Sequence, residues 1–173
     1  MKNIKNKEIE IKLIFDDKED IIKSIPDIIF KKSLKIRDRY YGREYLDMKN
    51  NHQIIRIREK INLFSELTYK GKTKNYNNIW ERTEINVPIE DAEKMNKILL
   101  LLGFKKIREF FSEREYWSMG DNIEIVFSKF KKPKFLEFME IEAKSHKGIN
   151  SLLKLLGNKT KEAGEEIFNI FDK

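Results

Sequence analysis

The chain has 173 residues, a formal net charge of +7 from 36 basic and 29 acidic residues, and no cysteine. This length suits one domain with a sizeable core, so we expect residues 1–173 to form a single domain. The absence of cysteine excludes disulfides and thiolate metal sites, and two histidines argue against a histidine-based zinc site. With no apolar run near the roughly 20 residues that span a bilayer, and no signal-peptide core near Met1, we expect a soluble, cytoplasmic protein.

Hydrophobic periodicity and helix breakers predict an α+β chain of eight strands and three or four helices. The predicted strands are residues 4–15, 33–41, 53–60, 63–72, 79–88, 104–117, 122–130 and 135–145. The predicted helices run from Asp16 or Asp17 to about Ser24, from Ile89 to Leu102, and through the tail from Gly148 to Asp172. Most connections are too short for crossovers, which favours antiparallel pairing.

Charged residues alternate with apolar residues along five of these strands. Because side chains two apart share a face of a strand, each of the five presents a charged face and a mostly apolar face. The charged faces carry Glu8, Glu10 and Lys12; Arg56 and Arg58; Lys70 and Lys72; Arg82 and Glu84; and Glu140, Glu142 and Lys144.

Two architectures are compatible with this alternation. One is an ordinary antiparallel sheet with a solvated face and ion pairs between strands. The other is a closed barrel that has no edges and turns its charged faces inward. In the barrel, the paired acids would repel unless a cation lay between them, and oxygen clusters suit Mg²⁺ or Mn²⁺. Clustered Arg and Lys would likewise call for a polyphosphate, so a metal-bound triphosphate would satisfy both groups.

The order of the motifs resembles the CYTH superfamily, which holds class IV adenylyl cyclases, thiamine triphosphatases and inorganic triphosphatases. The stretch before Arg82 and the Lys-Gly strand are most similar to the cyclase branch. The matching segments are Glu8-Ile9-Glu10-Ile11-Lys12, Asp38-Arg39-Tyr40-Tyr41, Arg56-Ile57-Arg58, Thr68-Tyr69-Lys70-Gly71, Arg82-Thr83-Glu84, Leu102-Gly103-Phe104 and Glu140-Ile141-Glu142. The resemblance implies a closed eight-stranded antiparallel barrel, a triphosphate tunnel, with helices packed on its outer face.

The same resemblance implies roles for the charged residues. Metal oxygens would come from Glu8, Glu10, Glu84, Glu140 and Glu142, with Mg²⁺ or Mn²⁺ as the cofactor. Phosphate oxygens would be held by Lys12, Arg56, Arg58, Lys70, Lys72, Arg82 and Arg114. Tyr40 with Lys70 resembles the pair that activates water in hydrolytic members, although Tyr40 could equally pack under a helix, and Lys72 could equally reach solvent at the strand end.

The chain also departs from the family pattern. Ser112 stands where the family usually has a lysine, and Ser128 where it often has a metal-binding aspartate. The favoured interpretation is an adenylyl cyclase that makes cyclic AMP and pyrophosphate from ATP. The alternatives are an inorganic or thiamine triphosphatase and, because of the two serines, a non-catalytic phosphate or RNA-end binder. No aromatic–basic strip typical of RNA binding is evident, and the partner is expected to be a nucleotide or inorganic triphosphate bound by a monomer or homodimer, without a membrane.

Overall fold

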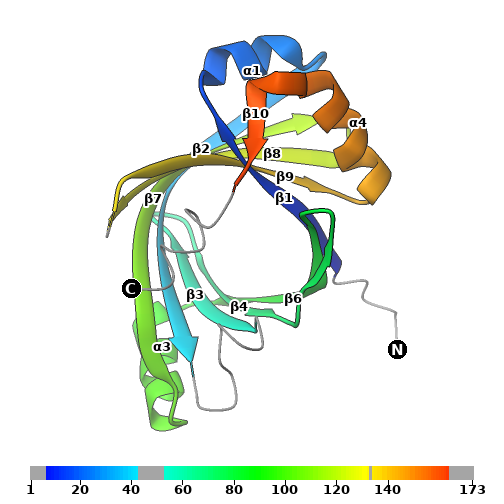
Figure 1. The fold of residues 1–173 in the computed structure, drawn as a ribbon. Helices are drawn as coiled ribbons and strands as arrows, with labels where there is room; N and C mark the ends of the chain where they lie inside the picture. The colour runs from blue at the N-terminus through cyan, green and yellow to red at the C-terminus, as the bar shows by residue number, and fades with distance from the viewer. Residues whose placement is uncertain (1–6, 43–52, 133, 164–173) are drawn as a thin grey trace.

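The computed structural model describes residues 7–42, 53–132 and 134–163. These residues form ten strands, three α-helices and a short 3₁₀ helix (Figure 1). The strands are β1 Lys7–Phe15, β2 Ile28–Gly42, β3 Ile54–Lys60, β4 Ser65–Lys70, β5 Lys74–Tyr76, β6 Ile79–Ile89, β7 Lys105–Met119, β8 Ile123–Lys132, β9 Leu136–Ala143 and β10 Thr160–Glu162. The helices are α1 Lys18–Ser24, α3 Ala92–Leu101 and α4 His146–Leu156, and a short 3₁₀ helix covers Gly157–Lys159.

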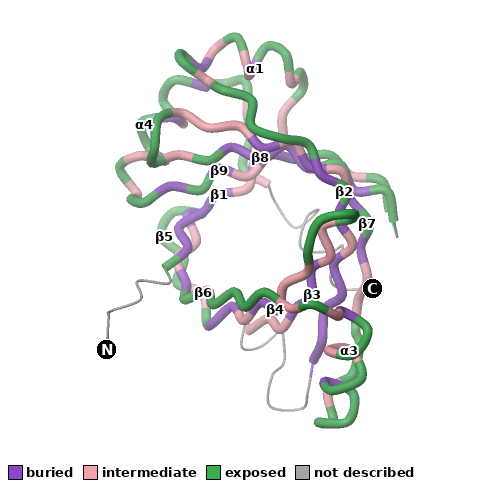
Figure 2. The backbone as a smooth tube through the Cα atoms, turned by 180° about the vertical axis from the view of Figure 1, so that it is seen from behind, coloured by how far each residue is buried: buried purple, intermediate pink, exposed green. Residues whose placement is uncertain are grey.

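Eight of the strands close into a barrel. The sheet runs in the order β1-β9-β8-β7-β2-β3-β4-β6, and β6 pairs back onto β1 to complete the ring. The closing pair is antiparallel, with Lys7 opposite Thr83 and Glu10 opposite Trp80. The predicted closed eight-stranded antiparallel barrel is therefore confirmed, and Figure 2 shows the ring from behind.

Two short strands extend the barrel and were absent from the sequence prediction. β5 pairs with the first residues of β6, next to where β4 ends on the same strand. The predicted strand 63–72 corresponds to β4, which ends at Lys70, and the backbone N–H of Gly71 donates to the Thr83 carbonyl oxygen before β5 begins at Lys74. β10 pairs with the end of β1, where Phe15 lies opposite Thr160.

The tail is only partly the predicted helix. α4 begins at His146 and ends at Leu156, where Gly157 has a positive φ of 54° that favours glycine. Residues 160–162 then pair with β1, because their backbone groups find partners on its edge, so the helix predicted there is wrong. The apolar residues 167–171 of that prediction lie outside the described residues.

Smaller differences affect the ends of other elements. β2 begins at Ile28 rather than at residue 33, because its first residues pair with the end of β7, Ile28 opposite Met119. α3 begins later than predicted, at Ala92, since β6 continues to Ile89 and the Asp91 carboxylate caps the N–H groups of Glu93 and Lys94.

The apolar faces of the strands form the outer core. Ile11 of β1 and Ile141 of β9 are almost fully buried beneath Ile149, Leu152 and Leu156 of α4. On another part of the barrel wall, Tyr41 and Ile57 pack against Ala92 and Leu99 of α3. This apolar packing holds α1 and α4 on one side of the barrel and α3 on another, and the charged residues of the strands face the barrel interior (Figure 1). Within the described part of the chain, no helix is long and apolar enough to cross a membrane.

Candidate active site in the barrel interior

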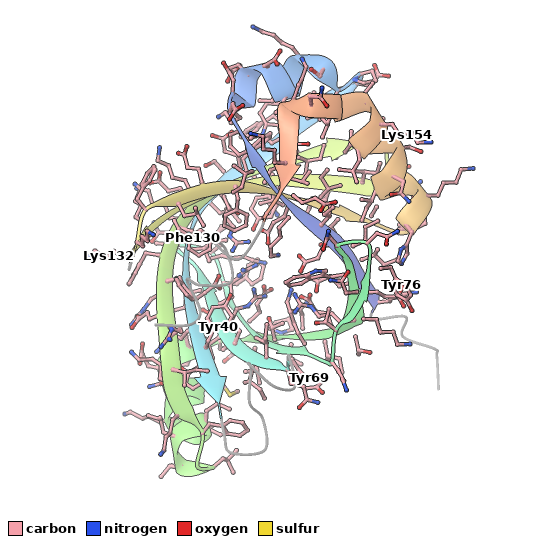
Figure 3. The ribbon with its side chains drawn as sticks, viewed as in Figure 1. Tyr40, Tyr69, Tyr76, Phe130, Lys132 and Lys154 are labelled. Carbon is pink, nitrogen blue, oxygen red and sulfur yellow. The ribbon has the colours of Figure 1, made fainter. Side chains whose placement is uncertain are left out.

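Charged side chains from six of the eight ring strands are buried inside the barrel, namely from β1, β2, β3, β4, β6 and β7. The alternation that buries Ile9 and Ile11 under the helices turns Glu8 and Glu10 to the opposite face. Figure 3 shows side chains filling the space that the strands enclose. The buried polar residues of the interior are Glu8, Glu10, Asp38, Arg56, Arg58, Thr68, Lys70, Arg82, Ser112, Arg114 and Ser128.

One side of the interior is an ion-pair cluster on β1, β4 and β6. The Glu8 carboxylate accepts hydrogen bonds from Lys70 and from Arg82, the latter at 2.6 Å. Arg82 also donates to Glu10 at 2.8 Å, and Lys70 lies 2.9 Å from Glu84. Closure of the barrel creates these contacts, since Glu8 and Lys70 are 62 residues apart in the chain.

The cluster continues across β1 to β9, β8 and β7. Lys12 donates to Glu10 at 2.9 Å and to Glu140 at 2.6 Å. The other oxygen of Glu140 accepts from Arg114 at 3.0 Å and from the hydroxyl of Ser128 at 3.4 Å. Ser112 accepts a 3.4 Å bond from Arg114 Nε. The two serines that depart from the family pattern therefore lie inside the barrel, each beside a charged residue of the cluster.

Asp38 completes a closed ring of side-chain contacts around the barrel, which we call the interior circuit. The sequence analysis assigned no role to this site residue. Arg58 donates two hydrogen bonds of 2.7 and 2.8 Å to its carboxylate, and a guanidinium nitrogen of Arg114 lies 3.6 Å from an oxygen of the same carboxylate. Arg56 lies 3.8 Å from Asp38 and donates to Thr68 at 3.2 Å. Thr68 donates to Asn86, and Asn86 to Glu84, which closes the ring of contacts around the interior.

These contacts set the ionisation states of the acids. Burial alone would raise the pKa of Asp38, but Arg58 and Arg56 hold this pKa well below its usual value. Burial likewise opposes ionisation of Glu84, yet Lys70 and the neighbouring hydrogen bonds lower its pKa to about 2. Burial opposes the charge of Lys12 as well, but Glu10 and Glu140 raise its pKa above the ordinary value. Asp38, Glu84 and Lys12 are consequently charged at neutral pH.

Glu142 differs from Asp38 and Glu84, because its pKa is raised. It lies on the same face of β9 as Glu140 and opposite Glu10 of β1. Although part of its side chain is accessible to solvent, burial of the carboxyl group disfavours the charged form. Repulsion from the carboxylates of Glu8 and Glu10 adds to this effect, and together they raise the pKa of Glu142 to about 8. Carboxylate oxygens of this kind are the ligands that a hard divalent cation prefers.

The predicted metal ligands are not gathered into one cluster. Among residues 7–42, 53–132 and 134–163, no group of three or more acids or histidines is spaced to hold a metal. Instead, Glu8, Glu10, Glu84 and Glu140 bind lysine or arginine side chains. Glu8, Glu10 and Glu142 nevertheless lie close enough to perturb one another, so the donor set of β1 and β9 fits the cation by its chemistry.

An aromatic layer lies beside the charged cluster, at one end of the interior. Tyr40 meets Phe110 edge to face with ring centroids 5.5 Å apart, and Phe110 meets Phe130 in the same way. Phe130 stacks on Phe138, and Figure 3 labels Tyr40 and Phe130. Tyr40 thus belongs to this layer, whereas Lys70 binds Glu8 and Glu84; their proposed catalytic pairing stays a prediction.

One predicted phosphate ligand lies apart from the others. Lys72 is exposed in the connection between β4 and β5. The other six, Lys12, Arg56, Arg58, Lys70, Arg82 and Arg114, all belong to the interior circuit. Asp38 could have been found from its place in the Asp38-Arg39-Tyr40-Tyr41 motif, because it shares a strand face with Tyr40.

Known proteins are similar to this chain in sequence or in fold. The protein MJ0240 of Methanocaldococcus jannaschii, named a candidate adenylate cyclase, is 34% identical over 126 residues, which cover 68% of this chain and 70% of MJ0240. The structure of PH1012 from Pyrococcus horikoshii OT3 superposes with a TM-score of 0.72 at 22% identity, covering 89% of this chain and 94% of PH1012. HpAC1 from Hippeastrum, a candidate adenylyl cyclase described as having a dominant triphosphatase activity, gives a TM-score of 0.71 at 16% identity, with 95% of both chains covered.

The solved structures establish the likeness of fold, and the sequence comparisons establish the family. The sequence model of the CYTH domain matches residues 6–166, which include every motif that forms the interior circuit. With this match and the identity to MJ0240, the chain belongs to the CYTH domain family.

Proposed function

We propose that this protein is a metal-dependent enzyme acting on a triphosphate held in the barrel interior. The observation that carries the proposal is the set of cations that the barrel closure brings together from β1, β3, β4, β6 and β7. Among them, Arg56 Nε is buried without a hydrogen-bond partner in the described part of the chain. A buried donor without an acceptor is costly, and a phosphate oxygen is an acceptor that would satisfy it.

The chain's own residues would bind and orient the phosphates. Arg56, Arg58 and Arg114 converge on Asp38 from two strands, so a phosphate chain could share or displace that carboxylate. Arginine presents a planar fork of donors that matches phosphate oxygens, and in an enclosed site such contacts stabilise charge that develops in the transition state. Lys12, Lys70 and Arg82 would neutralise the remaining phosphate charge.

We assign the cofactor, Mg²⁺ or Mn²⁺, to Glu8, Glu10 and Glu142, with Glu84 and Glu140 as the further carboxylates of the set. When bound, such an ion supplies charge neutralisation and orientation of the phosphate oxygens. The raised pKa of Glu142 supports this assignment, because burial and the repulsion from Glu8 and Glu10 both contribute to it, and a divalent cation would relieve the repulsion.

Within this class we favour an adenylyl cyclase in the cytoplasm. The ribose 3′-oxygen would attack the α-phosphorus, the bond to the bridging oxygen would break, and pyrophosphate would leave while the 3′-hydroxyl loses its proton. The identity to MJ0240 and its name support this choice. The second candidate is triphosphate hydrolysis, which the activity described for HpAC1 supports; there Tyr40 with Lys70 would activate water against the terminal phosphate.

Product analysis would test the proposal. The protein is incubated with ATP, tripolyphosphate and thiamine triphosphate, with Mg²⁺, Mn²⁺ or EDTA, and the products are separated by anion exchange. Cyclic AMP with pyrophosphate is expected from ATP, and only with metal. Phosphate release would favour the triphosphatase, while the absence of any product, or full activity in EDTA, would contradict the enzyme assignment or its metal dependence.

A further inference from the structure

The C-terminal end of α3 presents aliphatic side chains to solvent. Leu101 is 87% exposed and Leu102 57% exposed, and Ile98 and Leu100 beside them are exposed as well. Within this run only Leu99 turns inward, where it packs on the barrel wall. Single exposed leucines are common on protein surfaces, but four adjoining aliphatic side chains form a patch that marks a site of interaction.

The shape of the patch favours a membrane surface over a protein partner. Figure 1 shows α3 at the other end of the molecule from α1 and α4, and Figure 2 shows the outward side of this helix as exposed. The high exposure of Leu101 makes the patch a projecting end of a helix. Protein-binding surfaces are enriched in aromatic residues and arginine, whereas a projecting aliphatic end can enter the boundary between lipid headgroups and acyl chains.

The backbone at this end of α3 is hydrogen-bonded within the turn that follows the helix. The Gly103 N–H donates to the Leu100 carbonyl oxygen and the Phe104 N–H to the Leu99 carbonyl oxygen, each at 3.0 Å. Gly103 permits this turn because its φ is positive, at 85°. Since a carbonyl group without a partner is costly in an apolar phase, these bonds lower the cost of bringing the helix end into contact with lipid.

Lysines flank the aliphatic patch. Lys97 lies one helical turn before Leu101 on the same face of α3, and Lys105 begins β7 just after the turn. Both lysines are exposed, and within the described part of the chain neither forms a salt bridge. The acids Asp91 and Glu93 lie at the other end of α3. A second copy of this chain, with its net charge of +7, would be repelled here, whereas an anionic surface would be attracted.

We propose that this end of α3, residues 97–105, docks on the surface of an anionic lipid bilayer. Leu101 and Leu102 enter the boundary of the acyl chains, and Lys97 and Lys105 contact the lipid phosphates. The contact is peripheral and requires no membrane-spanning helix. It differs from the expectation of a chain that acts without a membrane, and it goes beyond the proposed function without depending on it, because no residue of the barrel interior takes part.

Vesicle sedimentation with the 173-residue chain would test the aliphatic contact. The vesicles are phosphatidylcholine alone and an equimolar mixture of phosphatidylcholine and phosphatidylglycerol. We expect binding to the mixed vesicles, and Leu101→Ser to weaken it by about tenfold or more, because the burial of a leucine side chain is lost. Leu155→Ser, the same change at an exposed leucine of α4, should bind as the wild type does. Thermal melting checks that each variant is folded.

A pair of double variants tests the lysines. Lys97→Gln/Lys105→Gln should weaken binding to the mixed vesicles by roughly 25-fold, about fivefold for each lysine at an anionic surface. Lys154→Gln/Lys161→Gln removes two exposed lysines from α4 and β10. At about 0.15 M salt, charges far from the contact are screened, so this control should stay within about twofold of the wild type.

A fluorescent label would report whether the patch enters lipid. Because the chain has no cysteine, Leu101→Cys and Leu155→Cys each offer a single position for an environment-sensitive fluorophore. We expect the mixed vesicles to shift the emission to shorter wavelength in Leu101→Cys and not in Leu155→Cys.

Several results would overturn the proposal. If the chain sediments with neither kind of vesicle, the patch does not dock on lipid, and an acidic protein becomes the candidate partner. Equal binding to the two kinds of vesicle, equal losses in test and control variants, or an unchanged emission in labelled Leu101→Cys would also contradict it. The triphosphate proposal would survive each of these results, since product analysis tests it separately.

Discussion

Arg56 and Arg58 lie two positions apart on the inner face of β3 but have different surroundings. Arg58 makes two hydrogen bonds to Asp38, whereas Arg56 makes one to Thr68 and keeps a buried Nε without a hydrogen-bond partner among the described residues. Arg58 is thus tied into the resting fold, and Arg56 is the side chain with spare donor capacity. The two positions allow charge and geometry to be tested separately.

Replacing either arginine with lysine keeps the charge and removes the planar fork. We expect Arg56→Lys and Arg58→Lys each to lower catalytic efficiency by roughly 10²–10³, because a lost charge-assisted contact in an enclosed site costs about 2.7–4 kcal/mol of transition-state stabilisation. Arg58→Lys should also lower the free energy of unfolding, since one lysine cannot replace both bonds to Asp38, whereas Arg56→Lys should fold as the wild type. Phosphate or pyrophosphate release and urea unfolding measure the two effects. Wild-type rates in both variants would show that β3 does not contribute to a phosphate site.

Glu142 gives the interior a pH dependence that can be measured without substrate. Its pKa is about 8 in the folded protein against an ordinary 4.5. Between these values the folded state binds more protons than the unfolded state, so the free energy of unfolding falls as pH rises through this window. In EDTA, we expect wild type and Glu142→Gln to be equally stable near pH 4.5 and the variant to be more stable at pH 8.5, by thermal melting. Parallel stability profiles would contradict the raised pKa.

At the scale of elements, the helices stabilise the barrel from outside by burying the apolar faces of its strands. Leu152 and Leu155 of α4 differ in this respect, because Leu152 is 1% exposed against β1 and β9 while Leu155 is 45% exposed. The two positions therefore form a matched pair on one helix, with the same chemical change and different burial.

Leu152→Ala should lower the free energy of unfolding by about 2–5 kcal/mol, the usual cost of removing a buried leucine side chain. Leu155→Ala should change it by no more than about 0.5 kcal/mol. Urea denaturation measures both. Equal losses would mean that α4 does not dock through the face that includes Ile149, Leu152 and Leu156.

The whole barrel should respond to its ligand, because the interior cations lie on strands that only the folded ring brings together. A ligand that binds the folded state alone stabilises it by mass action, by about 2.7 kcal/mol at a concentration of 100 times Kd. We therefore expect tripolyphosphate to raise the melting temperature of the wild type, and less so at high salt, which weakens ionic contacts.

Two variants that each lose one positive charge test whether tripolyphosphate binds in the barrel interior or on the surface. Arg114→Gln removes a cation beside Asp38 and Glu140, and Lys154→Gln removes an exposed cation from the outer face of α4. The stabilisation by tripolyphosphate should shrink in Arg114→Gln and persist in Lys154→Gln. The same loss in both variants would indicate binding through the overall positive charge.

Along each strand, the sequence alone determined which side chains share a face. The alternation in Glu8-Ile9-Glu10-Ile11-Lys12 follows from backbone geometry, so the charged face could be identified without knowing the neighbours of the strand. The start of α1 was similarly local, because the Asp17 carboxylate caps backbone groups only two and three residues ahead.

The tertiary structure decided which charges meet. Lys12 and Glu140 are 128 residues apart, and their contact exists only because β9 pairs with β1. The grouping of three arginines around Asp38 depends on the pairing of β2 with β3 and β7. The approach of Lys12 to Trp80 depends on the closure of β6 onto β1. β5 and β10 were not predicted, because strands of three residues are too short to show a sequence pattern and are defined by the strand edge with which they pair. Alternation is a property of one strand, whereas pairing and closure depend on residues far apart in the chain.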